Sequence, residues 1–307
     1  MDAELDAEPP CLADLNDDLL RKIACRLAES DLASAVALKR CSSRFKDLAT
    51  PLVANAVSRI NTKWRDAADK IGMKGAARIR GGLERNEVLT TLALPHNNIG
   101  AEGAAAIAEA LRGNAVLTTL DLSGNEICGI DEDGDGAYDA SGIVALADAL
   151  KVNGVLTNLV LRRNNIGAEG AKALASALRV NGVLTNLVLW GDNIGNEGAA
   201  ALASALRVNE VLTTLNLANN QIRDQGAAAI AEALRGNGVV TELDISWNQI
   251  GYKYNNIGPM GATAIADALR VNGVLKRINL EYNKLGDEGK GAIWDAVSGR
   301  VGFELRI

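Results

Sequence analysis

Residues 156–183 read Leu-Thr-Asn-Leu-Val-Leu-Arg-Arg-Asn-Asn-Ile-Gly-Ala-Glu-Gly-Ala-Lys-Ala-Leu-Ala-Ser-Ala-Leu-Arg-Val-Asn-Gly-Val, and residues 184–211 repeat this pattern with few changes. Seven units of this kind begin at Leu89, Leu117, Leu156, Leu184, Leu212, Val240 and Leu275. Their period is 28 residues, apart from insertions of 11 residues in the second unit and 7 in the sixth. A fixed period of this length is typical of a solenoid, in which no unit buries its apolar face alone.

Each unit is predicted to form a strand, a turn and a helix. In residues 89–94 the leucines at 92 and 94 alternate with small or polar residues, which indicates a strand with one buried face. An asparagine follows each strand, at positions 97, 125, 164, 220, 248 and 283. Its amide both donates and accepts, which suits turns stacked on identical turns. Asp192 takes this place once, and because a carboxylate cannot donate, we expect a weaker contact there.

Two glycines and an alanine-rich run complete the unit. The glycines, as in Gly100 and Gly103, permit a tight turn into a helix. The run that follows, residues 104–111, has apolar residues at helical spacing, and its alanines favour the helix and allow close packing.

These units resemble leucine-rich repeats of the ribonuclease-inhibitor-like class. The resemblance covers residues 71–307, as seven repeats preceded by an N-terminal half repeat. It implies an α/β solenoid, a horseshoe with a parallel β-sheet on the concave face and helices on the convex face. We expect residues 301–307 to form a closing strand, because terminal repeats must cover the core.

The N-terminal segment does not follow the period. Residues 1–11 are predicted to be a disordered acidic tail, and residues 49–70 a helical linker. Residues 12–48 resemble an F-box, a small all-α module, although Asn16 stands where that family has a proline. The resemblance implies contact with a Skp-type adaptor through Leu12, Leu15, Leu19, Ile23, Leu27 and Leu32. The alternative is a helical cap for the repeats.

The composition of the chain limits which classes of partner and which cellular compartment we expect for it. A net charge of −6 argues against a broad nucleic-acid footprint. No apolar run is long enough to span a bilayer, and the acidic N-terminus is unlike a signal peptide. The four cysteines show no metal-ligand spacing. We therefore expect a reducing intracellular compartment, cytoplasmic or nuclear, and neither nucleic acid nor membrane as a partner.

The 11-residue insertion contains closely spaced carboxylates. Asp131, Asp133, Asp135 and Asp139 fit the first, third, fifth and ninth positions of an EF-hand calcium loop. The twelfth position is Gly142, where that family has a bidentate glutamate. Calcium is the one cofactor that the sequence suggests, and the alternative is a solvated acidic loop.

Catalysis has little support in the sequence. His96 is the only histidine, and no nucleophile-elbow, zinc-protease or phosphate-loop motif is present. We therefore expect a protein that is not an enzyme.

Outward-facing strand positions are the better candidates for binding, because tryptophan and arginine are typical interface anchors. We expect a protein partner to contact Asn158, Arg162, Asn186, Trp190, Asp244 and Trp247. Together with the F-box-like segment, these residues predict a substrate-receptor subunit of a cullin-type ubiquitin ligase. The alternatives are a small-GTPase regulator, which the repeats suggest by resembling Ran GTPase-activating proteins, and a general leucine-rich-repeat scaffold or sensor.

Overall fold

The computed structural model describes residues 80–84, 86–130, 135–248 and 257–307. The predicted acidic tail, the F-box-like segment with its six adaptor residues and the helical linker lie outside these residues. Asp131 and Asp133 also lie outside the described residues, as does most of the predicted N-terminal half repeat. Residues 80–84 of this half repeat are described, and they are helical.

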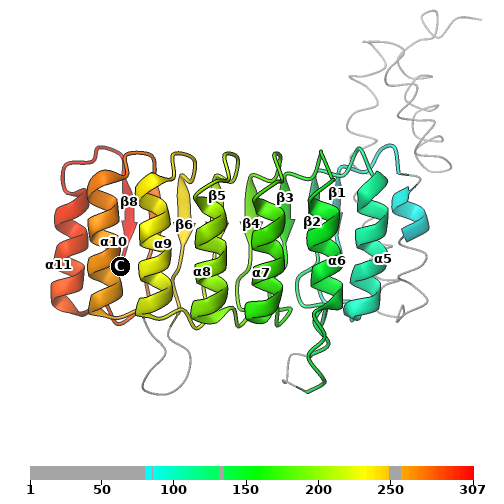
Figure 1. The fold of residues 1–307 in the computed structure, drawn as a ribbon, viewed down its shortest axis with the longest axis horizontal. Coiled ribbons are helices and arrows are strands. Elements are labelled where there is room, and N and C mark those ends of the chain that lie inside the picture. Colours follow the sequence, from blue (N-terminus) through cyan, green and yellow to red (C-terminus); the bar gives the residue numbers. More distant parts are fainter. Residues whose placement is uncertain (1–79, 85, 131–134, 249–256) are drawn as a thin grey trace, which may run out of the picture. The chain divides into compact units, whose positions relative to one another are not determined.

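The repeat body is one parallel sheet of eight strands with a helix after each of the first seven (Figure 1). The strands are β1 (Thr91–Ala93), β2 (Thr119–Asp121), β3 (Asn158–Val160), β4 (Asn186–Val188), β5 (Thr214–Asn216), β6 (Glu242–Asp244), β7 (Arg277–Asn279) and β8 (Glu304–Arg306). The helices are α5 (Gly100–Gly113), α6 (Ser141–Leu150), α7 (Gly167–Leu178), α8 (Gly195–Leu206), α9 (Asp224–Gly236), α10 (Pro259–Val271) and α11 (Gly286–Val297).

The order and register of the strands follow the sequence period. Each strand pairs with the next one along the chain, and each pairing aligns the central residues, as in Leu187 with Leu215. The predicted solenoid of strands and helices is confirmed, and so is the closing strand, which is β8. In Figure 1 the helices lie side by side on one face of the sheet, and we call the other face the open face.

The core lies between the sheet and the helices. Strand leucines such as Leu187 and Leu189 and helix residues such as Leu202 are fully buried. Each buried leucine stabilises the fold by roughly 1.5–3 kcal/mol. The second glycine of each pair has a packing role: a Cβ at Gly198 would come within 2.9 Å of the Ala171 Cβ on α7. Small residues therefore set the close spacing of the helices.

The asparagine that follows each strand joins three repeats. Asn220 is fully buried, and its Nδ2 donates to the carbonyl of Leu189, one repeat earlier. Its Oδ1 accepts the backbone N–H of Asp192 at 2.9 Å, and its own N–H donates to Asn248 Oδ1 at 2.8 Å. We call this chain of contacts the asparagine ladder, and it confirms the stacked turns that the sequence predicts.

Asp192 interrupts the ladder on its donor side only. Its Oδ1 accepts the N–H of Asn164 at 2.7 Å, as an asparagine would. Its Oδ2 is buried without a hydrogen-bond partner among the described residues, whereas the amide nitrogens of Asn164 and Asn220 donate to carbonyls at this place. Burial raises the pKa of the Asp192 carboxyl well above its usual range, and the N–H donors of Asn164 and Ile166 oppose this only in part.

A second asparagine ladder runs along the other edge of the sheet, where the strands begin. Asn181 Nδ2 donates to the carbonyl of Leu150 at 2.7 Å, and its Oδ1 accepts the N–H groups of Val183 and Leu184. The same bonds form at Asn114, Asn153, Asn209, Asn237 and Asn272. Both edges of the sheet are thus held by side-chain amides that bridge neighbouring repeats.

We predict that Asp192→Asn stabilises the protein by about 1–3 kcal/mol at pH 8, because the new amide supplies the missing donor. The raised pKa means that the wild-type carboxyl contributes fully below its unfolded pKa of about 3.9. That contribution is lost as the pH rises through the folded pKa. Urea denaturation of both proteins between pH 5 and 8 measures the difference, which should grow with pH. A variant that is less stable, or a difference that does not depend on pH, would contradict this account.

Candidate functional site

The residue just before each ladder position has a left-handed backbone. We call these seven residues the strand-end row: His96, Gly124, Arg163, Gly191, Asn219, Trp247 and Tyr282, with φ between 53° and 75°. Glycine adopts this conformation at least cost, and two repeats have it there. A bulky residue in the same conformation is uncommon and costs of order 1 kcal/mol or more. Trp247 and Tyr282 therefore occupy positions where backbone energy alone would favour glycine.

The two glycines of the row make room for side chains from the preceding repeat. A Cβ on Gly124 would lie 2.5 Å from Nδ1 of His96, so the imidazole ring lies over this glycine. A Cβ on Gly191 would lie 3.5 Å from Cγ of Arg163. The Arg163 guanidinium carbon lies 4.9 Å from the centre of the Trp190 ring, which is a cation–π contact.

The row ends in an aromatic stack. The rings of Trp247 and Tyr282 lie 3.8 Å apart, centre to centre, with 23° between their planes. Trp247 is 48% exposed and Tyr282 is 56% exposed, although each ring covers one face of the other. The pair is therefore a stacked aromatic surface that remains accessible to a partner.

Four of the six predicted binding residues lie together on neighbouring strands. Asn186 Nδ2 on β4 donates to Asn158 Oδ1 on β3 at 2.9 Å. Arg162 and Trp190 follow these strands by two residues, and Arg162 is exposed whereas Trp190 is half-buried. The structure therefore joins Asn158, Arg162, Asn186 and Trp190 into one patch, which Arg163 extends.

The other two predicted residues, Asp244 and Trp247, lie in the β6 repeat, beyond β5. Asp244 Oδ1 accepts from the N–H and hydroxyl of Ser246, and its Oδ2 accepts from Asn216 and Asn279 at 3.3 and 3.4 Å. A hollow of about 180 Å³ on the open face includes Asp244 in its lining. Asp244 thus orders a polar region of the open face, separate from the patch around Trp190.

Charge is distributed unevenly over these strands. Arg277 on β7 pairs with Glu304 at 2.5 Å and with Glu242 at 3.7 Å, and the Glu304 carboxylate is the main reason why the pKa of Arg277 is raised. By contrast, neither Arg162 nor Arg163 forms an ion pair with a described residue. The patch around Trp190 therefore has two guanidinium groups without a carboxylate partner in the described part of the chain.

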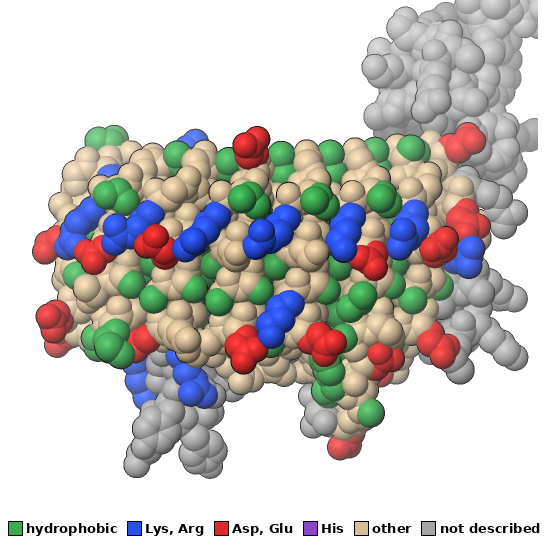
Figure 2. Space-filling model, viewed as in Figure 1, with side chains coloured by type: hydrophobic (Ala, Val, Ile, Leu, Met, Phe, Trp, Pro, Cys, Tyr) green, Lys and Arg blue, Asp and Glu red, His purple; other side chains and the backbone are tan. Residues whose placement is uncertain are grey.

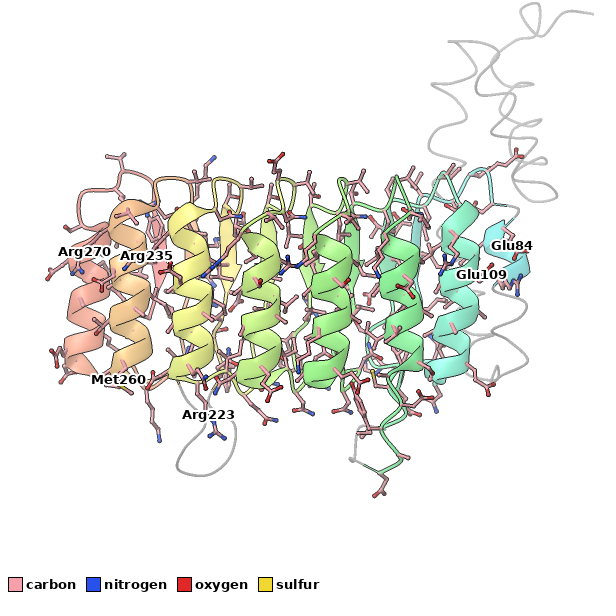
Figure 3. All side chains as sticks on the ribbon, in the orientation of Figure 1. Glu84, Glu109, Arg223, Arg235, Met260 and Arg270 are labelled. Carbon is pink, nitrogen blue, oxygen red and sulfur yellow. The ribbon has the colours of Figure 1, made fainter. Side chains whose placement is uncertain are left out.

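The helix face has a different character. A row of basic residues crosses it, one near the end of each helix from α5 to α10 (Figure 2). Arg235 and Arg270, labelled in Figure 3, each pair with an acid three residues earlier, as do Arg112 and Lys151. Most of the positive charge on this face is thus neutralised locally.

Two residues of the acidic insertion form hydrogen bonds with other described residues. Asp139 Oδ1 accepts the N–H of Ser141 at the start of α6, and this bond lowers the pKa of Asp139. The hydroxyl of Tyr138 donates to the carbonyl of Ile166 at 2.7 Å. Asp135 is exposed, and the described residues contain no cluster of three or more possible metal ligands. The calcium site stays a prediction, because two of its four carboxylates lie outside the described residues.

The described residues contain few other side chains that could act as a nucleophile or a general base. Cys128 is fully buried, and burial raises the pKa of its thiol to about 12, so it is not a thiolate near neutral pH. His96 lies in the strand-end row rather than in a pocket. None of the described helices is both long and apolar enough to cross a bilayer.

Sequence reasoning missed Arg163 and Tyr282. Their signal was present, since each occupies the position before a ladder asparagine that Trp247 also occupies. Arg163 contacts Trp190, and Tyr282 stacks on Trp247. Alignment of the repeats on this position, rather than on the strands, would have found both residues.

Comparison with known families agrees with this geometry. A leucine-rich repeat family model matches residues 85–108, 113–127, 152–175, 208–231, 236–253 and 271–293. The repeat body is a leucine-rich-repeat solenoid, and proteins of this fold are typically scaffolds for protein recognition. No curated protein matches the chain significantly.

Solved structures with a similar fold include those of three different proteins. Leiomodin-1 actin-binding site 2 is 22% identical, with 53% of this chain and 90% of that chain covered at a TM-score of 0.41. The tropomodulin C-terminal domain of Caenorhabditis elegans is 14% identical (52% and 92%, TM-score 0.40). LegL7, a leucine-rich repeat-containing protein from Legionella pneumophila, is 19% identical (72% and 75%, TM-score 0.39). None of these similarities indicates a function for this chain.

We predict that Gly124→Ala moves the His96 ring from its place, whereas Gly195→Ala does not. Both glycines have φ near 62°, so each alanine should cost about 1 kcal/mol in backbone strain. A Cβ at Gly195 meets no atom within 4 Å, whereas one at Gly124 meets the imidazole. His96 is the only histidine, so its imidazole proton resonances report on this contact alone. Unchanged His96 resonances in Gly124→Ala would show that the ring does not lie over this glycine.

Proposed function

We propose that this chain is a non-enzymatic recognition protein that binds a protein partner at the strand-end row and the adjoining open face. The observation that carries the proposal is the identity of the row residues. Bulky side chains occupy left-handed positions where glycine costs less, and they lie exposed in two stacks. Backbone strain of this kind clusters at functional sites.

The two stacks have the chemistry of interface anchors. Tryptophan, tyrosine and arginine are enriched among the few residues that dominate binding energy at protein interfaces. Trp247 and Tyr282 already hold each other in place, as do Arg163 and Trp190. Less side-chain entropy is therefore lost when a partner binds. The partner we infer presents carboxylates toward Arg162 and Arg163 and apolar groups toward the Trp247–Tyr282 stack.

The finer proposal assigns the F-box-like segment, residues 12–48, as a tether to a Skp-type adaptor. The repeat body would then present its bound partner to a cullin-type ubiquitin ligase, and ubiquitin transfer would depend on proximity rather than on chemistry by this chain. This proposal rests on the sequence resemblance of the segment. The small-GTPase alternative gains no supporting observation from the described residues.

We predict that Trp247→Ala weakens binding of the partner by roughly 30-fold, as expected for loss of an anchor worth about 2 kcal/mol. Arg163→Ala should weaken it less and should also reduce its salt dependence. The partner is first captured from a lysate on the full chain, and its affinity for each variant is then measured with purified proteins.

The matched control for this measurement is Trp294→Ala. Trp294 is 57% exposed on α11 and belongs to neither stack. It should leave the affinity unchanged. Equal affinities for the wild type, Trp247→Ala and Arg163→Ala would refute a role for the strand-end row in binding.

We predict that Ile23→Asp abolishes co-purification of a Skp-type adaptor while the captured partner still binds. Trp247→Ala should have the opposite effect, because the two variants change different segments of the sequence. Co-purification from cells that express the adaptor, quantified for both variants, is the measurement. Failure of the wild-type chain to retain any such adaptor would remove the ligase proposal and leave the recognition proposal intact.

A further inference from the structure

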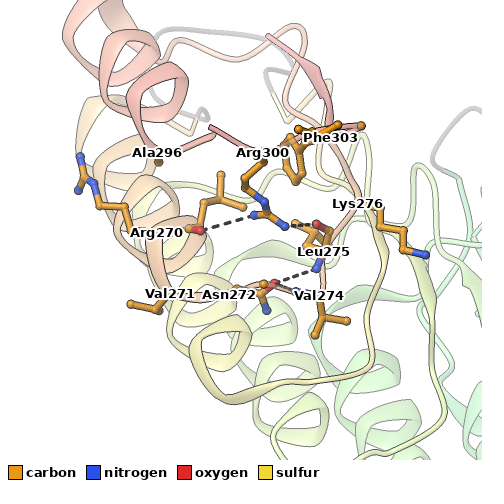
Figure 4. A pocket seen from close by; sticks show the side chains of 13 residues that line it. Arg270, Val271, Asn272, Val274, Leu275, Lys276, Ala296, Arg300 and Phe303 are labelled. Carbon is orange, nitrogen blue, oxygen red and sulfur yellow. Dashed lines mark hydrogen bonds between the residues drawn. The ribbon is translucent and has the colours of Figure 1, made fainter. Parts of the chain in front are cut away.

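A pocket of about 510 Å³ lies at the last two repeats, on the edge of the sheet where the strands begin. This is the edge opposite the strand-end row. The pocket lies between the turn from α10 to β7 and the turn from α11 to β8, and Arg300 occupies its centre (Figure 4). Val271, Val274, Leu275 and Phe303 give it apolar lining.

A change in the second asparagine ladder accounts for this pocket. Arg300 follows Asn272 by 28 residues and therefore stands where the next ladder asparagine would be. Its Nη1 donates to the carbonyl of Leu269 at 3.5 Å, and its Nη2 donates to the carbonyl of Leu275. The longer side chain replaces the donor of the amide but supplies no acceptor. The last turn is thus held by a cation rather than by a neutral amide.

The positive charge of Arg300 has no counter-ion within the described residues. Arg300 is half-buried, and both of its hydrogen-bond acceptors are neutral carbonyls. The ring of Phe303 lies 4.3 Å from the guanidinium carbon and shields one of its faces. Burial lowers the pKa of the Arg300 guanidinium. A guanidinium has five N–H donors, and the two carbonyls use two of them.

The residues around Arg300 add positive charge and no negative charge. The pocket lining contains Arg270 and Lys276 but no aspartate or glutamate. Arg270 pairs with Asp267, whereas Lys276 forms no ion pair with a described residue. In Figure 4 the side chains of Arg270 and Lys276 extend to either side of Arg300. The exposed Lys276 ammonium therefore adds a positive charge to the pocket lining without a carboxylate partner in the described part of the chain.

We propose that this pocket binds a ligand that carries an anionic oxygen group, a carboxylate or a phosphate, next to an apolar portion. The oxygen group accepts from the remaining N–H donors of Arg300 and from Lys276. Charge-assisted hydrogen bonds of this kind are stronger than those between neutral groups. The apolar portion contacts Val274 and Phe303. The volume lies in the range of small-molecule sites.

The experiment titrates the full chain with three probes by calorimetry. Phenyl phosphate and benzoate represent the two sources of the anion, and benzyl alcohol is the neutral control with the same ring. We expect at least one anion to bind with a dissociation constant of about 1 mM or lower, and benzyl alcohol to bind roughly tenfold more weakly. The stronger of the two anions identifies the oxygen group.

Two variants locate the binding. Lys276 is exposed at the rim of the pocket. Lys276→Glu should therefore weaken binding of the anion roughly tenfold without loss of folding. Arg300→Gln should abolish binding, and its thermal denaturation is compared with the wild type because Arg300 also holds the last turn. The control is Arg179→Gln. Arg179 follows α7 on the helix face, several repeats before the pocket, and its substitution should leave binding of the anion unchanged.

Either of two results overturns the proposal. One is that neither anion binds the wild-type chain more tightly than benzyl alcohol does. The other is that an anion binds Lys276→Glu as tightly as it binds the wild type, which would place the bound anion elsewhere. The second criterion holds even if Arg300→Gln does not fold.

Discussion

The structure depends on one interaction, the hydrogen bonding of a buried asparagine side chain to the backbone of its neighbouring repeats. At Asn220 a single side chain supplies a donor to Leu189 and an acceptor to Asp192. The contact repeats along the edge of the sheet where the strands end, so each repeat is fixed by the next. The residue before each ladder position has a left-handed backbone, and these residues form the strand-end row, in which His96, Arg163, Trp247 and Tyr282 are exposed.

The fold could be predicted from the sequence because its physics is local and periodic. Alternating leucines predict each strand, and the ladder asparagine follows from a side chain that both donates and accepts. The weaker contact expected at Asp192 agrees with its Oδ2, which has no hydrogen-bond partner among the described residues. The second ladder was missed, although Asn181 and its equivalents recur with the same period.

The candidate site was less predictable, because it depends on contacts between repeats. Sequence register places Trp190 on the open face, but it does not show that Arg163 crosses Gly191 to reach the indole ring. Nor does it show that Trp247 and Tyr282 form a stack, since an insertion separates their repeats in the sequence. The spacing that suggests calcium at Asp139 also does not show that this carboxylate accepts a hydrogen bond at the start of α6.

The most direct test of the ladder is hydrogen exchange at the backbone amides whose N–H groups donate to ladder side chains. The N–H groups of Asn164, Asp192 and Asn220 donate to ladder side chains that are fully buried. If the ladder fixes the repeats, these amides exchange only through global unfolding and are as protected as the strand amides. Exchange of these three amides much faster than that of the strands would contradict the account.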